Sequence, residues 1–117
     1  MSCLFNSISY FIDENSYNIR QKICDYLENN YIIIEGLETK DILAMESNNY
    51  ISNMRNITTW GGAIEIQAAC NIWNMSIVVY DLRNNLKNKI VFIPINSDID
   101  KTIELEWNGG HYEPIKK

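Results

Sequence analysis

Three residues of this 117-residue chain have side chains that could together perform nucleophilic catalysis: Cys3, His111 and Glu113. A thiolate is a strong nucleophile, an imidazole can accept the thiol proton, and a carboxylate can orient the imidazole. Cys3 begins an apolar pattern typical of a helix, and the N-terminal end of a helix stabilises a thiolate. His111 follows a pair of glycines, whose backbone can approach a substrate closely. Glu113 is two residues further on, so in a strand it shares a face with His111.

Each of these residues also has a purely structural interpretation. Cys3 could be an incidental thiol, Glu113 could be a solvated carboxylate on an edge strand, and the only histidine of the chain could be a surface residue. Cys24 and Cys70 fall within apolar helical patterns, so we expect both to be buried and unreactive. The three cysteines are too far apart in sequence for a usual zinc site. We therefore expect neither a metal nor a cofactor.

The spacing of apolar residues predicts helices in the first half of the chain and strands in the second. The expected helices are 3–11, 17–28 with Ser16 as N-cap, a third from Thr39, a short one at 50–54, and 63–73. The expected strands are 75–80, 89–95, 102–107 and 111–115, with a loop at 83–88 and a turn at 108–110. Helices first and antiparallel strands last indicate an α+β domain.

Composition limits the classes of protein to consider. The length suits one domain over residues 1–117, and 46% of the residues are hydrophobic, which argues against disorder. Ten basic and 15 acidic residues give a net charge of −5, which argues against a nucleic-acid partner. No apolar run is long enough to span a membrane, and no signal peptide precedes the first helix. An odd number of cysteines then predicts free thiols in the cytoplasm.

Five blocks of the chain, in order, resemble one known family. They are Cys3-Leu4-Phe5-Asn6-Ser7-Ile8-Ser9, residues 19–27, residues 50–54 with Trp60-Gly61-Gly62 and 63–69, residues 77–80, and Asn108-Gly109-Gly110-His111-Tyr112-Glu113. This series is similar to the OTU (ovarian tumour) family of cysteine proteases, which are deubiquitinases. The resemblance covers nearly the whole chain. It implies a papain-like OTU fold of class α+β, with N-terminal helices packed on a small, mainly antiparallel C-terminal sheet.

The resemblance also implies roles for individual residues. Cys3 would be the nucleophile and His111 the general base, and Glu113 falls where the family usually has Asp or Asn. The implied reaction is hydrolysis of the (iso)peptide bond after the C-terminal glycine of ubiquitin or a ubiquitin-like modifier. The implied partner is therefore ubiquitin or such a relative, bound by a monomer in the cytosol, or in a host's cytosol for a viral protein or a bacterial effector.

A narrow channel would admit the slender Gly-Gly tail of ubiquitin and exclude bulkier chains. The expected channel wall consists of Trp107, Asn108, Gly109 and Gly110. We expect Trp60 to pack in the core. Glu65 could cap its helix, tether a loop or simply face water.

One feature departs from the family. An Asp-Gly-Asx-type loop normally precedes the nucleophile and supplies an oxyanion-hole N–H, whereas only Met1 and Ser2 precede Cys3. The backbone N–H groups of Ser2 and Cys3 are then the expected oxyanion donors. A circular permutation, a truncated gene, or a catalytically weak domain that binds ubiquitin without cleaving it would also account for the difference. An unrelated α+β domain with coincidental matches is the remaining alternative.

Overall fold

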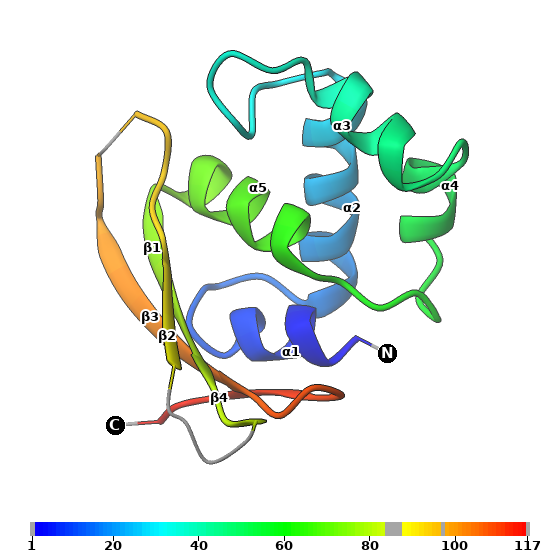
Figure 1. The fold of residues 1–117 in the computed structure, drawn as a ribbon. Coiled ribbons are helices and arrows are strands. Elements are labelled where there is room, and N and C mark those ends of the chain that lie inside the picture. Colours follow the sequence, from blue (N-terminus) through cyan, green and yellow to red (C-terminus); the bar gives the residue numbers. More distant parts are fainter. Residues whose placement is uncertain (1, 84–87, 97, 117) are drawn as a thin grey trace.

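The computed structural model describes residues 2–83, 88–96 and 98–116. Within these residues, helices precede strands, which confirms the α+β class (Figure 1). The helices are α1 (Cys3–Ser9), α2 (Ser16–Glu28), α3 (Thr39–Glu46), α4 (Tyr50–Met54) and α5 (Ala63–Trp73). The strands are β1 (Met75–Asp81), β2 (Asn88–Phe92), β3 (Lys101–Trp107) and β4 (Tyr112–Pro114).

Most element boundaries agree with the sequence pattern, and the differences have local causes. Helix α2 begins one residue earlier than predicted, because the side chain of Asn15 accepts a hydrogen bond from the Asn18 N–H at 2.8 Å. Ser16 as N-cap was therefore wrong. Strand β2 ends at Phe92 rather than at residue 95, and Pro94, which follows, has no N–H to donate to a strand. Of the predicted loop at 83–88, residues 84–87 lie outside the described part of the chain.

The four strands form one mixed sheet in the order β2-β1-β3-β4. Strand β1 pairs antiparallel with β2, and β3 pairs antiparallel with β4, but the central pair of β1 and β3 is parallel. The register places Asp81 beside Trp107 and Trp107 beside Tyr112. The C-terminal ends of β1 and β3 and the start of β4 therefore lie at the same end of the sheet. The turn between β3 and β4, with its predicted site residues, lies at this end as well.

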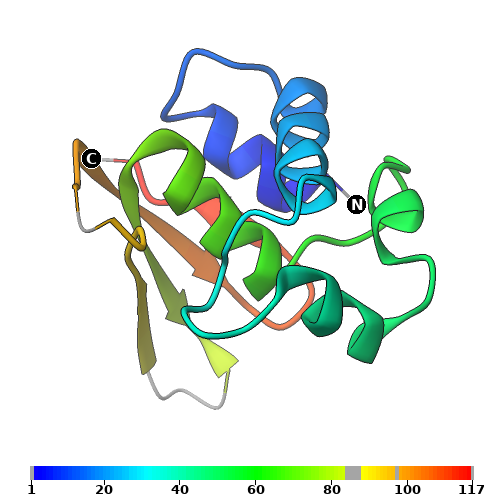
Figure 2. The same ribbon diagram turned by 90° about the horizontal axis from the view of Figure 1, so that it is seen from above.

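The helices cover one face of the sheet. Helices α1 and α5 lie against the strands, and α2 lies behind them, with α3 and α4 further out (Figures 1 and 2). Alternate residues of the central strands, such as Ile77 and Leu105, face these helices and are completely buried. Burial of this apolar surface holds the two layers together. None of the described helices is both long enough and apolar enough to cross a membrane.

Candidate active site

Cys3 is the first residue of α1 and is 7% exposed. The next two residues, Leu4 and Phe5, are fully buried and fix α1 in the core. Helix α1 packs against β4, the strand that begins directly after His111. Burial raises the pKa of the Tyr112 hydroxyl, and the thiol of Cys3 and the carboxyl of Glu65 contribute to the same shift. The nucleophile candidate therefore lies within electrostatic reach of β4.

His111 lies immediately before β4 and contacts the carboxylate expected to orient it. Its Nε2 is 2.7 Å from Oε1 of Glu113, and both side chains are about half exposed or more, at 48% and 62%. With Nε2 engaged, Nδ1 is the ring nitrogen that would exchange a proton with a nucleophile. No hydrogen bond joins Cys3 to His111 in residues 2–83, 88–96 and 98–116. Their pairing as nucleophile and base stays a prediction.

A cleft of about 570 Å³ is lined by Gly110 and Tyr112, the chain neighbours of His111, but not by Cys3, His111 or Glu113 themselves. Part of its lining is the segment that leads into α5 and part is the turn between β3 and β4, while residues of β1 and β2 complete it. The lining consists of Trp60, Gly61, Gly62, Ala63, Ile66, Val79, Ile90, Phe92, Trp107, Gly109, Gly110 and Tyr112. Three of the four residues expected in the channel wall line this cleft. The fourth, Asn108, is not among the lining residues; its Oδ1 accepts a hydrogen bond from the Gly110 N–H at 3.0 Å and so shapes the turn.

Trp60 does not pack in the core, contrary to the expectation from its sequence. Its side chain lies at the rim of the cleft, and the residue is 51% exposed. The reason lies in the next residue, Gly61, whose backbone rests directly on α1. A Cβ at Gly61 would lie 2.8 Å from Cδ2 of Leu4 and 2.9 Å from Cζ of Phe5. The core beneath this segment is already filled, so the indole stays outside.

Glu65 ties the cleft wall to the helices and is 1% exposed. Its Oε1 accepts a hydrogen bond from the Gly62 N–H at 2.7 Å, and its Oε2 accepts one from the Tyr50 hydroxyl at 2.5 Å. Burial raises the pKa of Glu65 despite these two hydrogen bonds, and burial and the nearby carboxylate raise the pKa of Tyr50. Glu65 therefore caps α5 and ties it to Tyr50, the first residue of α4, and the alternative that it faces water was wrong.

Arg20 is a residue of this region that the sequence reasoning missed. It is 1% exposed, donates to the Met54 carbonyl at 2.8 Å and to Oγ of Ser2 at 3.3 Å, and lies over the Phe5 ring at 4.3 Å. Burial lowers its pKa. The guanidinium thus holds the residue that precedes Cys3. An arginine on the apolar face of a helix, next to Ile19, was the signal that could have identified it.

The remaining two thiols are buried, as predicted. Burial raises the pKa of Cys24 to about 11 and that of Cys70 to about 12, so both stay protonated at neutral pH. The described residues contain no group of three or more His, Cys, Asp or Glu side chains that could hold a metal ion.

Comparison with known sequences identifies related proteins. The family described as OTU-like cysteine protease matches residues 2–112. Ubiquitin thioesterase OTU1 of Xenopus laevis is 26% identical over 99% of this chain and 38% of its own length. Ubiquitin thioesterase otu2 of Schizosaccharomyces pombe is 32% identical over 97% of this chain and 42% of its own length. The chain thus spans less than half of either relative.

Solved structures share the fold. An OTU domain in complex with ubiquitin superimposes with a TM-score of 0.75, at 24% identity, over 97% of this chain and 62% of that chain. An OTU deubiquitinase from Wolbachia pipientis wMel bound to ubiquitin gives a TM-score of 0.67, at 14% identity, over 99% of this chain and 90% of that chain. Because the family match extends over nearly the whole sequence, the chain belongs to the OTU-like cysteine protease family.

Proposed function

We propose that this protein is a deubiquitinase that hydrolyses the (iso)peptide bond after the C-terminal glycine of ubiquitin or a ubiquitin-like modifier. The observation that carries the proposal is the cleft lined by two pairs of glycines, one from the segment before α5 and one from the turn between β3 and β4. Four glycines among the lining residues leave room for a slender Gly-Gly tail. Relatives named ubiquitin thioesterases, and solved OTU domains described as bound to ubiquitin, support the same substrate.

In the proposed mechanism, Cys3 attacks the carbonyl carbon of the terminal glycine. His111 takes the thiol proton at Nδ1 and passes it to the leaving amine, which leaves a thioester on the protein. Water, activated by the same imidazole, then hydrolyses the thioester and releases ubiquitin. Glu113 holds the ring through Nε2. The N–H groups of Ser2 and Cys3 would stabilise the oxyanion, because the first N–H groups of a helix have no partner within it.

The proposed setting follows from charge and thiol chemistry. A net charge of −5 favours association with a basic substrate surface. The three cysteines are free, as in proteins of a reducing compartment. We propose that the protein acts as a monomer in the cytosol, which would be a host's cytosol if its source is a virus or an effector-producing bacterium.

A covalent probe tests the proposal. The protein is incubated with ubiquitin that carries a thiol-reactive group at its C-terminus, and the mass of the product is measured. We expect one added ubiquitin on the wild type and on the Cys70→Ala control, and none on Cys3→Ala. Labelling that persists in Cys3→Ala would assign the nucleophile elsewhere and overturn the mechanism.

A ubiquitin-binding module without strong catalysis is the second candidate. It is favoured by one observation: in the described part of the chain, the Cys3 thiol makes no hydrogen bond to the His111 ring. This function predicts that the wild type binds ubiquitin but resists the covalent probe. Titration of ubiquitin, followed by the probe reaction on the same sample, distinguishes the two candidates.

A further inference from the structure

We propose that Arg83 is a positioning residue that holds the Trp107 side of the cleft in place and thereby sets the affinity for the substrate tail. The inference rests on the proposed function, since it concerns the same cleft. Arg83 itself is not among the residues that line the cleft in the described part of the chain, so its effect must pass through its neighbours.

Arg83 is anchored at the end of β1 by Asp81. Its Nε donates to Oδ1 of Asp81 at 3.0 Å and its Nη2 donates to Oδ2 at 2.7 Å, while the Arg83 backbone N–H also donates to Oδ1 at 3.0 Å. The hydrogen bonds to Arg83 lower the pKa of Asp81, and the bond to Asp81 raises the pKa of Arg83. The side chain of Asp81 is only 10% exposed. Two bonds to one carboxylate fix the plane of the guanidinium as well as its position.

The anchored guanidinium covers Trp107 and abuts the turn beyond it. Its Cζ lies 4.3 Å from the centre of the Trp107 ring, which is the geometry of a cation–π contact. The stem of the same side chain passes Gly109, where an added Cβ would lie 3.2 Å from Cδ of Arg83. Gly109 has a φ of +101°, a conformation that favours glycine. One side chain therefore supports both an aromatic and a glycine of the same cleft wall.

Trp107 is held from the neighbouring strand as well. Its ring stacks on that of Tyr112 with centroids 6.0 Å apart and planes 23° apart. Strand β3, which carries Trp107, lies between β1 and β4. Arg83 follows β1 and Tyr112 begins β4, so the two residues contact Trp107 from the strands on either side of β3. Tyr112 is 9% exposed and fixed by the core, whereas Arg83 depends on Asp81 alone among the ion pairs of the described residues. Removing Arg83 therefore frees the face of the indole that it covers, while the contacts of Trp107 with Tyr112 and the core remain.

The consequence is specific to binding. Without Arg83, ordering of the indole must accompany substrate binding, which weakens the complex. Arg83 has no hydrogen bond, ion pair or ring contact with Cys3 or His111 in the described residues, so the chemical step should be unaffected. Loss of Arg83 should therefore raise KM and leave kcat nearly unchanged, a separation that a general loss of structure would not produce.

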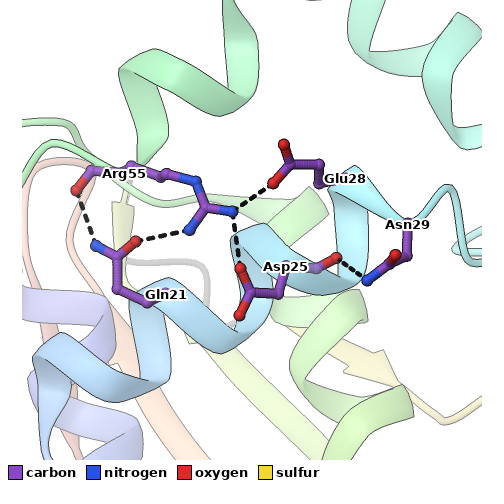
Figure 3. A network of polar contacts seen from close by, with 5 residues as sticks. All are labelled: Gln21, Asp25, Glu28, Asn29 and Arg55. Atoms are coloured by element: carbon purple, nitrogen blue, oxygen red, sulfur yellow. Dashed lines mark hydrogen bonds and ion pairs between the residues drawn. The ribbon is translucent and has the colours of Figure 1, made fainter.

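A second surface arginine provides the matched control. Arg55 donates from Nη2 to Asp25 at 2.8 Å and to Glu28 at 2.6 Å, and from Nη1 to Gln21 at 2.8 Å (Figure 3). It follows α4 and contacts α2. Helix α4 lies on the side of the molecule away from the sheet (Figure 1). Arg55→Ala thus removes a comparable network of ion pairs without touching the cleft.

The experiment measures kcat and KM on ubiquitin with a fluorogenic amide at its C-terminal glycine. For Arg83→Ala we expect KM to rise about fivefold, the scale of one exposed cation–π contact, with kcat within about twofold. Arg83→Lys should recover only part of the loss, because an ammonium cannot pair in two places and stack. Arg55→Ala should match the wild type. An unchanged KM, or a loss confined to kcat, would overturn the inference.

A measurement without substrate separates this inference from the proposed function. In protein labelled with 5-fluorotryptophan, the Trp107 resonance is assigned by its absence in Trp107→Phe. We expect Arg83→Ala to shift that resonance and Arg55→Ala to leave it in place. A resonance that Arg83→Ala does not move overturns the positioning role. If the wild type neither binds nor cleaves ubiquitin while the resonance moves, the proposed substrate is wrong and the support of Trp107 by Arg83 stands.

Discussion

Replacing Gly61 with alanine would place a methyl group between the cleft wall and the helix that carries Cys3. The new Cβ would lie 2.8 Å from Cδ2 of Leu4 and 2.9 Å from Cζ of Phe5, well inside van der Waals contact. Leu4 is 1% exposed and Phe5 is completely buried, so neither side chain can swing into solvent. Either these side chains leave their packed positions or the wall moves away from α1.

The size of the effect follows from the cost of overpacking a core, which is about 1–3 kcal/mol for added methylene-sized groups. For a chain of this length, the entropy of unfolding converts 1 kcal/mol into about 4 °C of Tm. We therefore expect Gly61→Ala to lower Tm by roughly 4–12 °C. Because the strain falls on the residues that follow Cys3, the rate of labelling by the ubiquitin probe should fall as well.

Thermal unfolding followed by circular dichroism checks this prediction, with Gly62→Ala as the control. A Cβ at Gly62 would meet no atom within 4 Å, so only the poorer N-cap preference of alanine applies, about 1 kcal/mol or less. Since Gly62 lines the cleft, that variant should lose affinity for substrate more than stability. A Tm of Gly61→Ala within about 2 °C of the wild-type Tm would refute the steric reasoning. A Tm of Gly62→Ala lower than that of Gly61→Ala would refute it as well.

Three further results are expected. Burial raises the pKa of Glu65 above its usual 4.5, so the native state keeps this proton to higher pH than the unfolded state, and stability falls as pH rises from 4.5 through the raised pKa. In urea denaturation, Glu65→Gln should flatten the dependence of the unfolding free energy on pH. An unchanged pH dependence in Glu65→Gln would argue against a raised pKa of Glu65. His111→Ala should slow hydrolysis by at least about a hundredfold and Glu113→Ala by less, because the Glu113 carboxylate only orients the ring; equal losses would give both residues the same weight. Finally, Cys24 and Cys70 should react with a thiol reagent only after unfolding, and rapid reaction of either in the native protein would contradict their raised pKa values.

Local pattern was sufficient for most of the secondary structure. Helix α5 begins and ends where its apolar spacing predicted, between Gly62 and Asn74, which has a left-handed φ of 50°. The same spacing correctly predicted the burial of Cys24 and Cys70. The two-residue period of a strand predicted that His111 and Glu113 share a face, and the 2.7 Å contact between their side chains agrees. These features depend on neighbours a few residues away, which periodicity and capping preferences describe.

Other features required the tertiary structure, since they depend on residues far apart in the chain. The exposure of Trp60 follows from the close packing of Gly61 on Leu4 and Phe5, which its own sequence neighbourhood does not reveal. The parallel pairing of β1 with β3 brings Arg83 to Trp107, although a strand lies between them in sequence.

The sequence by itself therefore determined the order of the elements, the family and the residues with reactive side chains, because these are properties of local pattern and side-chain chemistry. Only the tertiary structure decided which segments form the walls of the cleft and which buried or anchored side chains, such as Glu65 and Arg83, hold those walls in place. The physical reason is that long-range packing and charge pairing are set by the whole core rather than by any one segment.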